Sequence, residues 1–223
     1  MKPLLGPLRV VLLVGLVVAA VAGLVLVPVG KVLPIHWGLS GAADGFAPRE
    51  LALLMPLVIA AIAWGIFLLL PRFARHDDID AGKRPLGVAL TALTALALLL
   101  EVAIVLIGVG VDVNMVQVIS IAIGALMIVL GNALPKSQRN SLAGLRIPST
   151  LKDPANWQAT HRLTGFLSIG GGVLLIIVAL VAPVTALIWW LLACVLIPFA
   201  VGVLYSIAYE RSARARPKGG RRH

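Results

Sequence analysis

The chain has 223 residues, of which 60% are hydrophobic and only 13% carry a charge. A soluble domain is about half apolar and about a quarter charged, so this composition excludes a water-soluble globule and a disordered chain. The length fits one compact domain, and the apolar excess places that domain in a membrane. The formal net charge is +10, but the basic residues lie beside apolar segments, where membrane topology and anionic lipid account for them. Since the chain carries no nucleic-acid-binding motif, we expect no direct binding of DNA or RNA.

Six segments are apolar enough to cross a bilayer, because each lacks Lys and Arg for about the 20 residues that a spanning helix needs. In chain order they are Val10–Val29, Leu51–Leu70, Leu86–Val111, Val113–Leu134, Leu163–Ala182 and Val184–Tyr209. The third contains Glu101, whose insertion costs roughly 3 kcal/mol and is outweighed by the surrounding Leu, Ile and Val residues. The sequence therefore predicts an all-α membrane protein with six transmembrane helices.

The distribution of basic residues predicts the orientation of these helices. All but two of the 19 Lys and Arg residues precede the first helix, follow the second or fourth helix, or lie in the tail; the exceptions are Lys31 and Arg49. Because cytoplasmic loops are enriched in Lys and Arg, both termini are predicted to face the cytoplasm. An alternative at the start is a cleaved leader, since Ala20–Ala22 resembles a cleavage site, although the apolar run continues to Val29.

The links between the helices divide the chain into four units. These are residues 1–70, with two helices and an outer link; 71–134, a central helical hairpin; 135–210, a long inner link with a C-terminal hairpin; and 211–223, a basic flexible tail. The links at Asp112 and at Pro183 are very short, which predicts that the helices on either side form antiparallel hairpins.

Two longer links hold most of the polar residues. The outer link, Gly30–Glu50, contains Gly and Asp residues that favour tight turns. In the inner link, Pro135–Arg162, the pair Asp153–Pro154 predicts the N-cap and the first position of a helix. That helix would place Trp157 and His161 four residues apart on one face.

Glu101 is the most unusual single residue, because an acid inside a membrane commonly marks a proton or cation pathway. Helical spacing puts Thr94, Gly108 and Asp112 near its face. The two halves of the chain also share a short, short, long pattern of helices, and inverted repeats of three helices are typical of transporters. These features support a small proton-coupled transporter. The alternative is a protonated, structural carboxyl group that hydrogen-bonds a neighbouring helix.

The chain lacks the residue patterns of an enzyme or a cofactor site. No serine lies in a GxSxG motif, and neither a P-loop nor HExxH is present. Asp44 and Glu50 could join His36 at one metal ion, but nothing in their spacing is diagnostic of a metal site. Cys194 is the only cysteine and lies in an apolar run, so we expect it to be a small apolar residue that packs against its neighbours. Gly165 and Gly170–Gly172 predict a close contact between helices. We therefore expect no catalysis, cofactor or metal.

Two blocks of sequence match the pattern of a known family. The first, Leu33–Gly45, contains Pro-Ile-His-Trp-Gly followed by Asp-Gly. The second, Gly131–Arg162, contains Gly-Asn-Ala-Leu-Pro-Lys, then Gly-Leu-Arg-Ile-Pro, Trp and Thr-His-Arg. On these residues the chain resembles the SdpI family of bacterial membrane proteins, which are immunity proteins against a secreted killing peptide. Leu145 and Ile147 stand where that family often has Ile and Thr.

The resemblance implies protection against a membrane-active peptide toxin on the outer side, and a cytoplasmic regulator as a second partner. The candidate binding residues of the outer link are His36, Trp37, Gly41 and Asp44. The signature residues of the inner link are Asn132, Pro135, Lys136, Asn140, Gly144, Arg146, Pro148, Trp157, Thr160, His161 and Arg162. A surface suited to an acidic partner or to lipid headgroups is expected from Lys136, Arg139, Arg146 and Arg162. We expect Asn132 and Asn140 to satisfy backbone groups near the end of the fourth helix. As the structural alternative, both blocks are turns that fix where the second and fifth helices begin.

Overall fold

The computed structural model describes residues 6–215. Six long helices dominate this part of the chain, together with a β-hairpin and two short helical segments. In chain order the elements are α1 (Pro7–Leu26), β1 (Val32–Trp37), β2 (Ala43–Pro48), α2 (Arg49–Phe73), α3 (His76–Gly108), α4 (Met115–Ala133), the 3-10 turn η1 (Leu134–Lys136), α5 (Pro148–Lys152), α6 (Pro154–Val181) and α7 (Val184–Ala215). The basic tail predicted over residues 211–223 begins as a continuation of α7, and residues 216–223 lie outside the described residues.

The six long helices are each long and apolar enough to cross a membrane, which confirms the number and order predicted from the sequence. Several helices extend beyond their apolar runs: α3 begins at His76 rather than at Leu86, and α6 begins at Pro154 rather than at Leu163. Absence of Lys and Arg marks the part of a helix that lies in hydrocarbon, whereas the helical hydrogen bonds continue past it into polar sequence.

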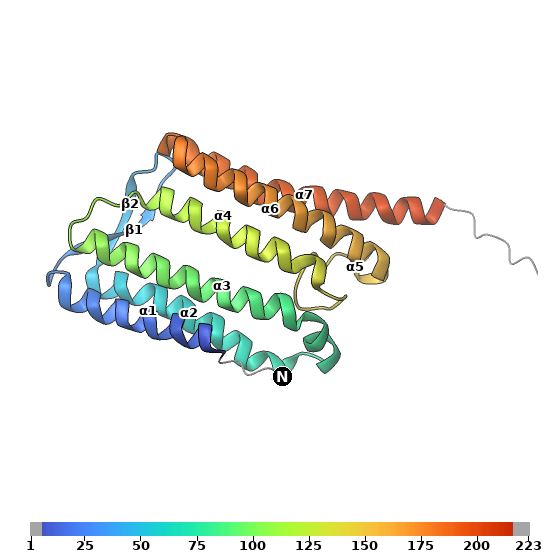
Figure 1. Cartoon of the computed structure of the whole chain (residues 1–223), viewed down its shortest axis with the longest axis horizontal. Helices are drawn as coiled ribbons and strands as arrows, with labels where there is room; N and C mark the ends of the chain where they lie inside the picture. The colour runs from blue at the N-terminus through green and yellow to red at the C-terminus, as the bar shows by residue number, and fades with distance from the viewer. Residues whose placement is uncertain (1–5, 216–223) are drawn as a thin grey trace, which may run out of the picture.

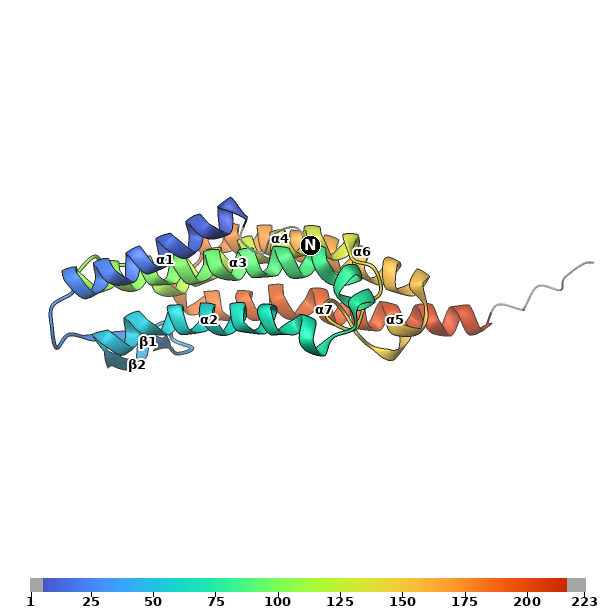
Figure 2. The same ribbon diagram turned by 90° about the horizontal axis from the view of Figure 1, so that it is seen from below.

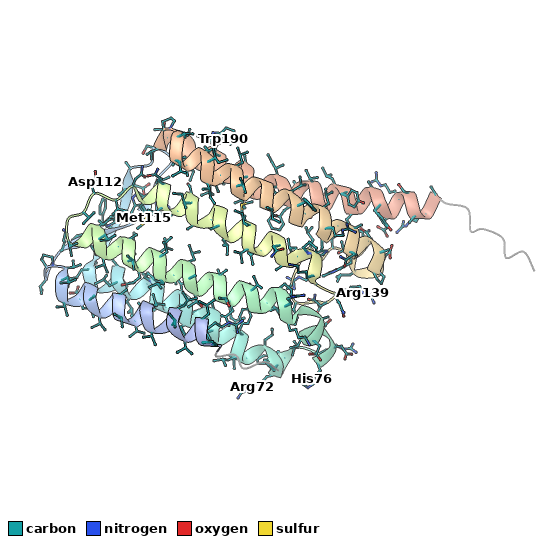
Figure 3. All side chains as sticks on the ribbon, viewed as in Figure 1. Arg72, His76, Asp112, Met115, Arg139 and Trp190 are labelled. Carbon is teal, nitrogen blue, oxygen red and sulfur yellow. The ribbon has the colours of Figure 1, made fainter. Side chains whose placement is uncertain are left out.

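The helices form one elongated bundle with two different ends (Figure 1). One end carries β1 and β2 and is called the hairpin end; Asp112 and Met115 lie there (Figure 3). At the opposite end α1 begins and α7 ends, so the described chain enters and leaves the bundle on one side, as an even number of spans requires. This end contains Arg72 and Arg139 and is called the basic end (Figure 3).

The bundle consists of two groups of three helices. In the first group α3 packs against both α1 and α2, and in the second α6 packs against both α4 and α7. The groups meet where α3 packs on α4, and the short links before α4 and α7 form the two predicted helical hairpins. Viewed from below, α2 and α7 lie in one layer, and α1, α3, α4 and α6 lie in the other (Figure 2). Within each group the remaining pair, α1 with α2 and α4 with α7, is also in contact, but less extensively.

Helices α4 and α6 approach so closely that their backbones touch. A Cβ atom on Gly124 would lie 2.7 Å from the carbonyl oxygen of Gly172, and one on Gly131 would lie 2.7 Å from that of Gly165. The predicted role of Gly165 and Gly172 in helix contact is thus confirmed, because small residues allow such packing in membranes. Gly170 takes no part in it and faces open space.

The outer link is a two-stranded antiparallel sheet, which corrects the expectation of an all-α chain with tight turns in this link. Leu33 pairs with Ala47, and both are buried against the ends of α1, α2 and α3. Burial alternates along residues 43–48 of β2 but not regularly along residues 32–37 of β1, and the Gly and Asp residues of the link favour turns, so the sequence pattern did not indicate two strands. Residues 38–42 form the turn between the strands, where Gly41 has a φ of 81° that favours glycine.

The two basic residues of the hairpin end neutralise the ends of helices. The Nζ of Lys31 donates to the carbonyl oxygen of Gly108, the last residue of α3, over 2.7 Å. The guanidinium of Arg49 donates to the carbonyl oxygens of Leu24 and Val27 at the end of α1 and also bonds the Glu50 carboxylate. A cation is favourable at the negative end of a helix dipole. These exceptions to the charge asymmetry therefore have a local structural role.

Candidate functional site

The structure separates the residues singled out in the sequence into three regions. The outer-link residues lie at the hairpin end, Glu101 lies in the interior of α3, and the inner-link signature lies at the basic end (Figure 1). These regions do not converge on one reacting centre. Each is therefore described by itself.

At the hairpin end, His36 and Asp44 form an exposed pair. The Nδ1 atom of His36 lies 2.6 Å from Oδ1 of Asp44, and the two side chains are 71% and 53% exposed. Two glycines, Gly38 directly after β1 and Gly45 in β2, make room for this pair: a Cβ on Gly38 would lie 2.5 Å from the Asp44 carboxylate, and one on Gly45 would lie 2.8 Å from Cβ of His36. The glycines of the first block therefore leave the space in which His36 and Asp44 can lie side by side.

Trp37 and Gly41 attach the hairpin to both helix groups. Trp37 is half-buried and packs against the core formed by α2, α3, the start of α4 and the end of α1, and also against the core between α4, α6 and α7. Gly41 lies directly on the side chain of Val184 at the start of α7. Of the four candidate binding residues, His36 and Asp44 are free to meet a ligand, while Gly41 and most of Trp37 hold the hairpin in place.

A groove of about 330 Å³ lies between the two helix groups, directly next to the hairpin. Its walls come from α2 and α7 and its floor from α3 and α4, and residues 35–38 of the hairpin line it as well. Apart from His36, every side chain along it is apolar, including Met55, Ile59, Leu100 and Ile188. Sequence reasoning missed this groove, because groove-facing and lipid-facing residues have the same composition. Its chemistry suits an apolar chain or helix that enters from the bilayer.

At the basic end, the second block folds into a lobe around Trp157 and His161. The two rings stack with centroids 4.0 Å apart, so the shared helix face predicted for them is confirmed. The backbone N–H of Leu145 donates to Nε2 of His161 over 3.0 Å, and the Nδ1 of His161 lies 2.8 Å from the carbonyl oxygen of Trp157. These contacts assign the proton to Nδ1 and make His161 a neutral, structural residue. Gly144, with a φ of 114°, lies against the ring.

The start of α6 is capped as predicted. Asp153 accepts a hydrogen bond from the backbone N–H of Ala155, and Pro154 occupies the first helical position. Asn140 accepts from the backbone N–H groups of Leu142 and Ala143, so its predicted role in satisfying backbone groups is confirmed. Asn132 instead accepts from Nζ of Lys136, which corrects its expected role.

A buried polar cluster joins α5, α6 and α7. The Asn156 amide donates to the carbonyl oxygens of Ser149 and Ser206, and its oxygen accepts from the hydroxyl groups of Thr160 and Ser206. The Ser149 and Ser206 hydroxyl groups also share a hydrogen bond of 2.7 Å. All four side chains are buried. Sequence reasoning found Thr160 but missed Asn156, Ser149 and Ser206; the isolated serine in the apolar run of α7 was the available signal.

The remaining signature residues divide into turn-forming prolines and exposed cations. Pro135 is the second residue of η1, and Pro148 is the first residue of α5. The four cations expected to form a basic surface, Lys136, Arg139, Arg146 and Arg162, are all exposed, as is Lys152. Arg139 and Arg146 also donate to backbone oxygens, those of Leu151 and Ser141. The second block is therefore mainly a structural lobe with a basic surface.

Glu101 is completely buried, and in the described residues neither carboxyl oxygen has a hydrogen-bond partner. Thr94, on the same face, instead bonds Leu90 and the indole of Trp64. The expected proximity of Asp112 is wrong, because α3 ends at Gly108 and Asp112 is exposed in the link beyond it (Figure 3). The predicted stripe of polar groups is thus reduced to an isolated acid.

Six apolar helices, a hairpin next to an apolar groove and a polar lobe at the opposite end define a multi-pass helical membrane protein. Residues 136–206 match the model of the SdpI/YfhL protein family, and residues 11–60 match that of a domain of unknown function (DUF1648). The relative "Immunity protein SdpI" of Bacillus subtilis (strain 168) is 23% identical over 181 residues, which are 80% of this chain and 84% of that protein. No solved structure matches. Together the two family models and this relative support a relationship of the chain to the SdpI family.

Proposed function

We propose that this protein protects a bacterial cell against a membrane-active peptide, and that the hairpin end faces the outside. The relative in Bacillus subtilis is named as an immunity protein. The orientation rests on the Lys and Arg residues, which concentrate at the basic end and are expected on the cytoplasmic side. A peptide that arrives from outside then meets the hairpin first.

The apolar groove beside the hairpin carries the proposal. It offers a volume of about 330 Å³ for the apolar face of a peptide, and the exposed His36 and Asp44 next to it offer polar contacts. A peptide that has inserted into the bilayer can enter such a groove sideways without leaving the hydrocarbon. Binding there would withhold the peptide from the assemblies that permeabilise the membrane.

The test is survival and membrane potential of a sensitive bacterium exposed to the killing peptide, with and without this chain. Filling the groove with Ala63→Trp should raise sensitivity about tenfold or more, as expected when a well-packed contact region is lost. Ala63 lines the groove, whereas Ala61, two residues away on α2, is exposed and does not line it. Ala61→Trp is therefore the matched control and should protect like the unmodified chain. Equal killing with and without the chain, at equal protein levels in the membrane, would refute the proposed function.

We further propose that the basic surface of the lobe contacts an acidic cytoplasmic regulator. Arg139, Arg146 and Arg162 are exposed there, and Arg139 donates to the carbonyl oxygen of Leu151 in α5. A peptide in the groove also touches α7 at Ile188, so one helix connects the two regions. Complementary charge gives such a contact specificity and a fast association rate.

A second candidate function, a small proton-coupled transporter, rests on the isolated carboxyl group of Glu101. If Glu101 carries protons, then Glu101→Gln in reconstituted vesicles should reduce the decay of a pH gradient to that of empty vesicles. Glu50→Gln is the control, because Glu50 is an exposed acid at the hairpin end. Equal decay in the unmodified chain and Glu101→Gln would exclude this function and leave Glu101 as a structural residue.

A further inference from the structure

A second cleft, of about 470 Å³, lies near the basic end between α3, α4 and α6. It is lined by Arg84 of α3, Lys136 of η1 and Asn132 near the end of α4. The rest of its wall is apolar and includes Val88, Val129 and Ile169. It is separate from the groove beside the hairpin, since the two share no residue.

The two cations of this cleft are not neutralised by an acid. Arg84 is exposed and has neither a hydrogen bond nor an ion pair with any part of the chain that the structure describes. Lys136 donates to the neutral amide oxygen of Asn132 over 2.9 Å. The nearest acids along α3 are engaged elsewhere: Asp80 pairs with Lys83, and Asp78 bonds Ser141. Two positive charges therefore border one cleft, and an anion is the ligand they favour.

The cleft also has the right depth relative to the apolar part of the bundle. Arg84 and Lys136 each lie two residues outside an apolar run, those that start at Leu86 and end at Leu134. Val88 and Val129 lie inside those runs. The cations are consequently at the level of the lipid headgroups, and the apolar wall is at the level of the acyl chains. A free phosphate ion would contact only the two cations and would leave the apolar wall unused.

We propose that this cleft is a binding site for an anionic phospholipid. The headgroup phosphate is held between Arg84 and Lys136, and one acyl chain lies along Val88, Val129 and Ile169. The site joins α3 of the first helix group to α4 and α6 of the second, so a bound lipid would hold the two groups together. This goes beyond the proposed protection function and does not depend on it.

The experiment uses the purified full chain in neutral detergent and titrates it with phosphatidylglycerol, counting bound lipids by native mass spectrometry. The double variant Arg84→Ala with Lys136→Ala should weaken binding about tenfold or more. The matched control is Arg72→Ala with Arg75→Ala, which removes the same charge from exposed residues that do not line the cleft. This control variant should change the binding of phosphatidylglycerol by less than about twofold, because salt screens the attraction between the lipid and exposed charges outside the cleft.

Further arms distinguish a phospholipid site from a phosphate site and from diffuse surface charge. Phosphatidylcholine should bind weakly, and inorganic phosphate at millimolar concentration should not displace the phosphatidylglycerol. Val129→Trp fills the apolar wall without changing any charge and should also reduce binding.

If both double variants weaken binding equally, the effect is non-specific surface charge and the proposal is wrong. Displacement by inorganic phosphate, or full binding by Val129→Trp, would likewise overturn a phospholipid site. Gel filtration and thermal unfolding confirm that each variant is folded, and Arg84→Gln with Lys136→Gln replaces the alanine pair if that pair is not.

Discussion

Replacing Gly165 with leucine should separate α4 from α6 and prevent the second helix group from folding. A Cβ on Gly165 would lie 2.5 Å from the carbonyl oxygen of Gly131 and 3.0 Å from the ring of Pro135. Both neighbours are rigid, so the helices themselves must move apart. Overpacking of a core costs about 1–3 kcal/mol when side chains can adjust, and a clash with backbone at the tightest helix pair should cost roughly 3 kcal/mol or more.

The measurement is the fraction of monodisperse protein after detergent extraction, followed by its thermal unfolding. Gly170→Leu is the control, since it lies on the same helix and a Cβ there meets no atom within 4 Å. The control should be extracted and unfold like the unmodified chain, because it adds an apolar group on a lipid-facing surface. If Gly165→Leu and Gly170→Leu behave alike, the close approach of α4 and α6 is not what holds this half of the protein together.

Features that depend on neighbouring residues could be predicted from the sequence. Hydropathy over about 20 residues determines whether a segment crosses a bilayer, and all six spans were found in this way. The cap formed by Asp153 and the common face of Trp157 and His161 also follow from local spacing. Each of these features is decided within one stretch of sequence, of about four residues for the cap and the shared face and about 20 residues for a span.

Features that join distant parts of the chain could not be predicted. Asn156 and Ser206 are 50 residues apart, and no periodicity in either helix connects them. The hairpin depends on Leu33 fitting a core formed by three helices. The stripe expected around Glu101 failed because it assumed that α3 continues to Asp112. Both the groove and the cleft likewise exist only once several helices have packed together.

Asn156→Ala should strongly destabilise the lobe at the basic end. The amide makes four hydrogen bonds that connect α5, α6 and α7, and the side chain is completely buried. Its loss leaves two carbonyl oxygens and two hydroxyl groups short of partners in an environment that water does not reach. Leaving buried polar groups unsatisfied costs about 1–3 kcal/mol each, and partial rearrangement should bring the total to roughly 2–4 kcal/mol.

The matched control for this variant is Gln158→Ala, two residues further along α6. Gln158 is also an amide and donates to the carbonyl oxygen of Pro135 over 2.8 Å, but it is exposed, so water can replace the lost bond. Gln158→Ala should lower the free energy of unfolding by less than about 1 kcal/mol.

Hydrogen exchange should locate the effect of Asn156→Ala. Exchange should accelerate in α5, in the first turns of α6 and in the part of α7 around Ser206, while α1 and α2 stay protected. Uniformly faster exchange in all helices would contradict a local role, whereas unchanged exchange would mean that the polar cluster does not hold the lobe. A locally loosened lobe would also release the exposed arginines from their fixed positions, so this variant should lose any contact with a cytoplasmic partner while the groove at the opposite end stays intact.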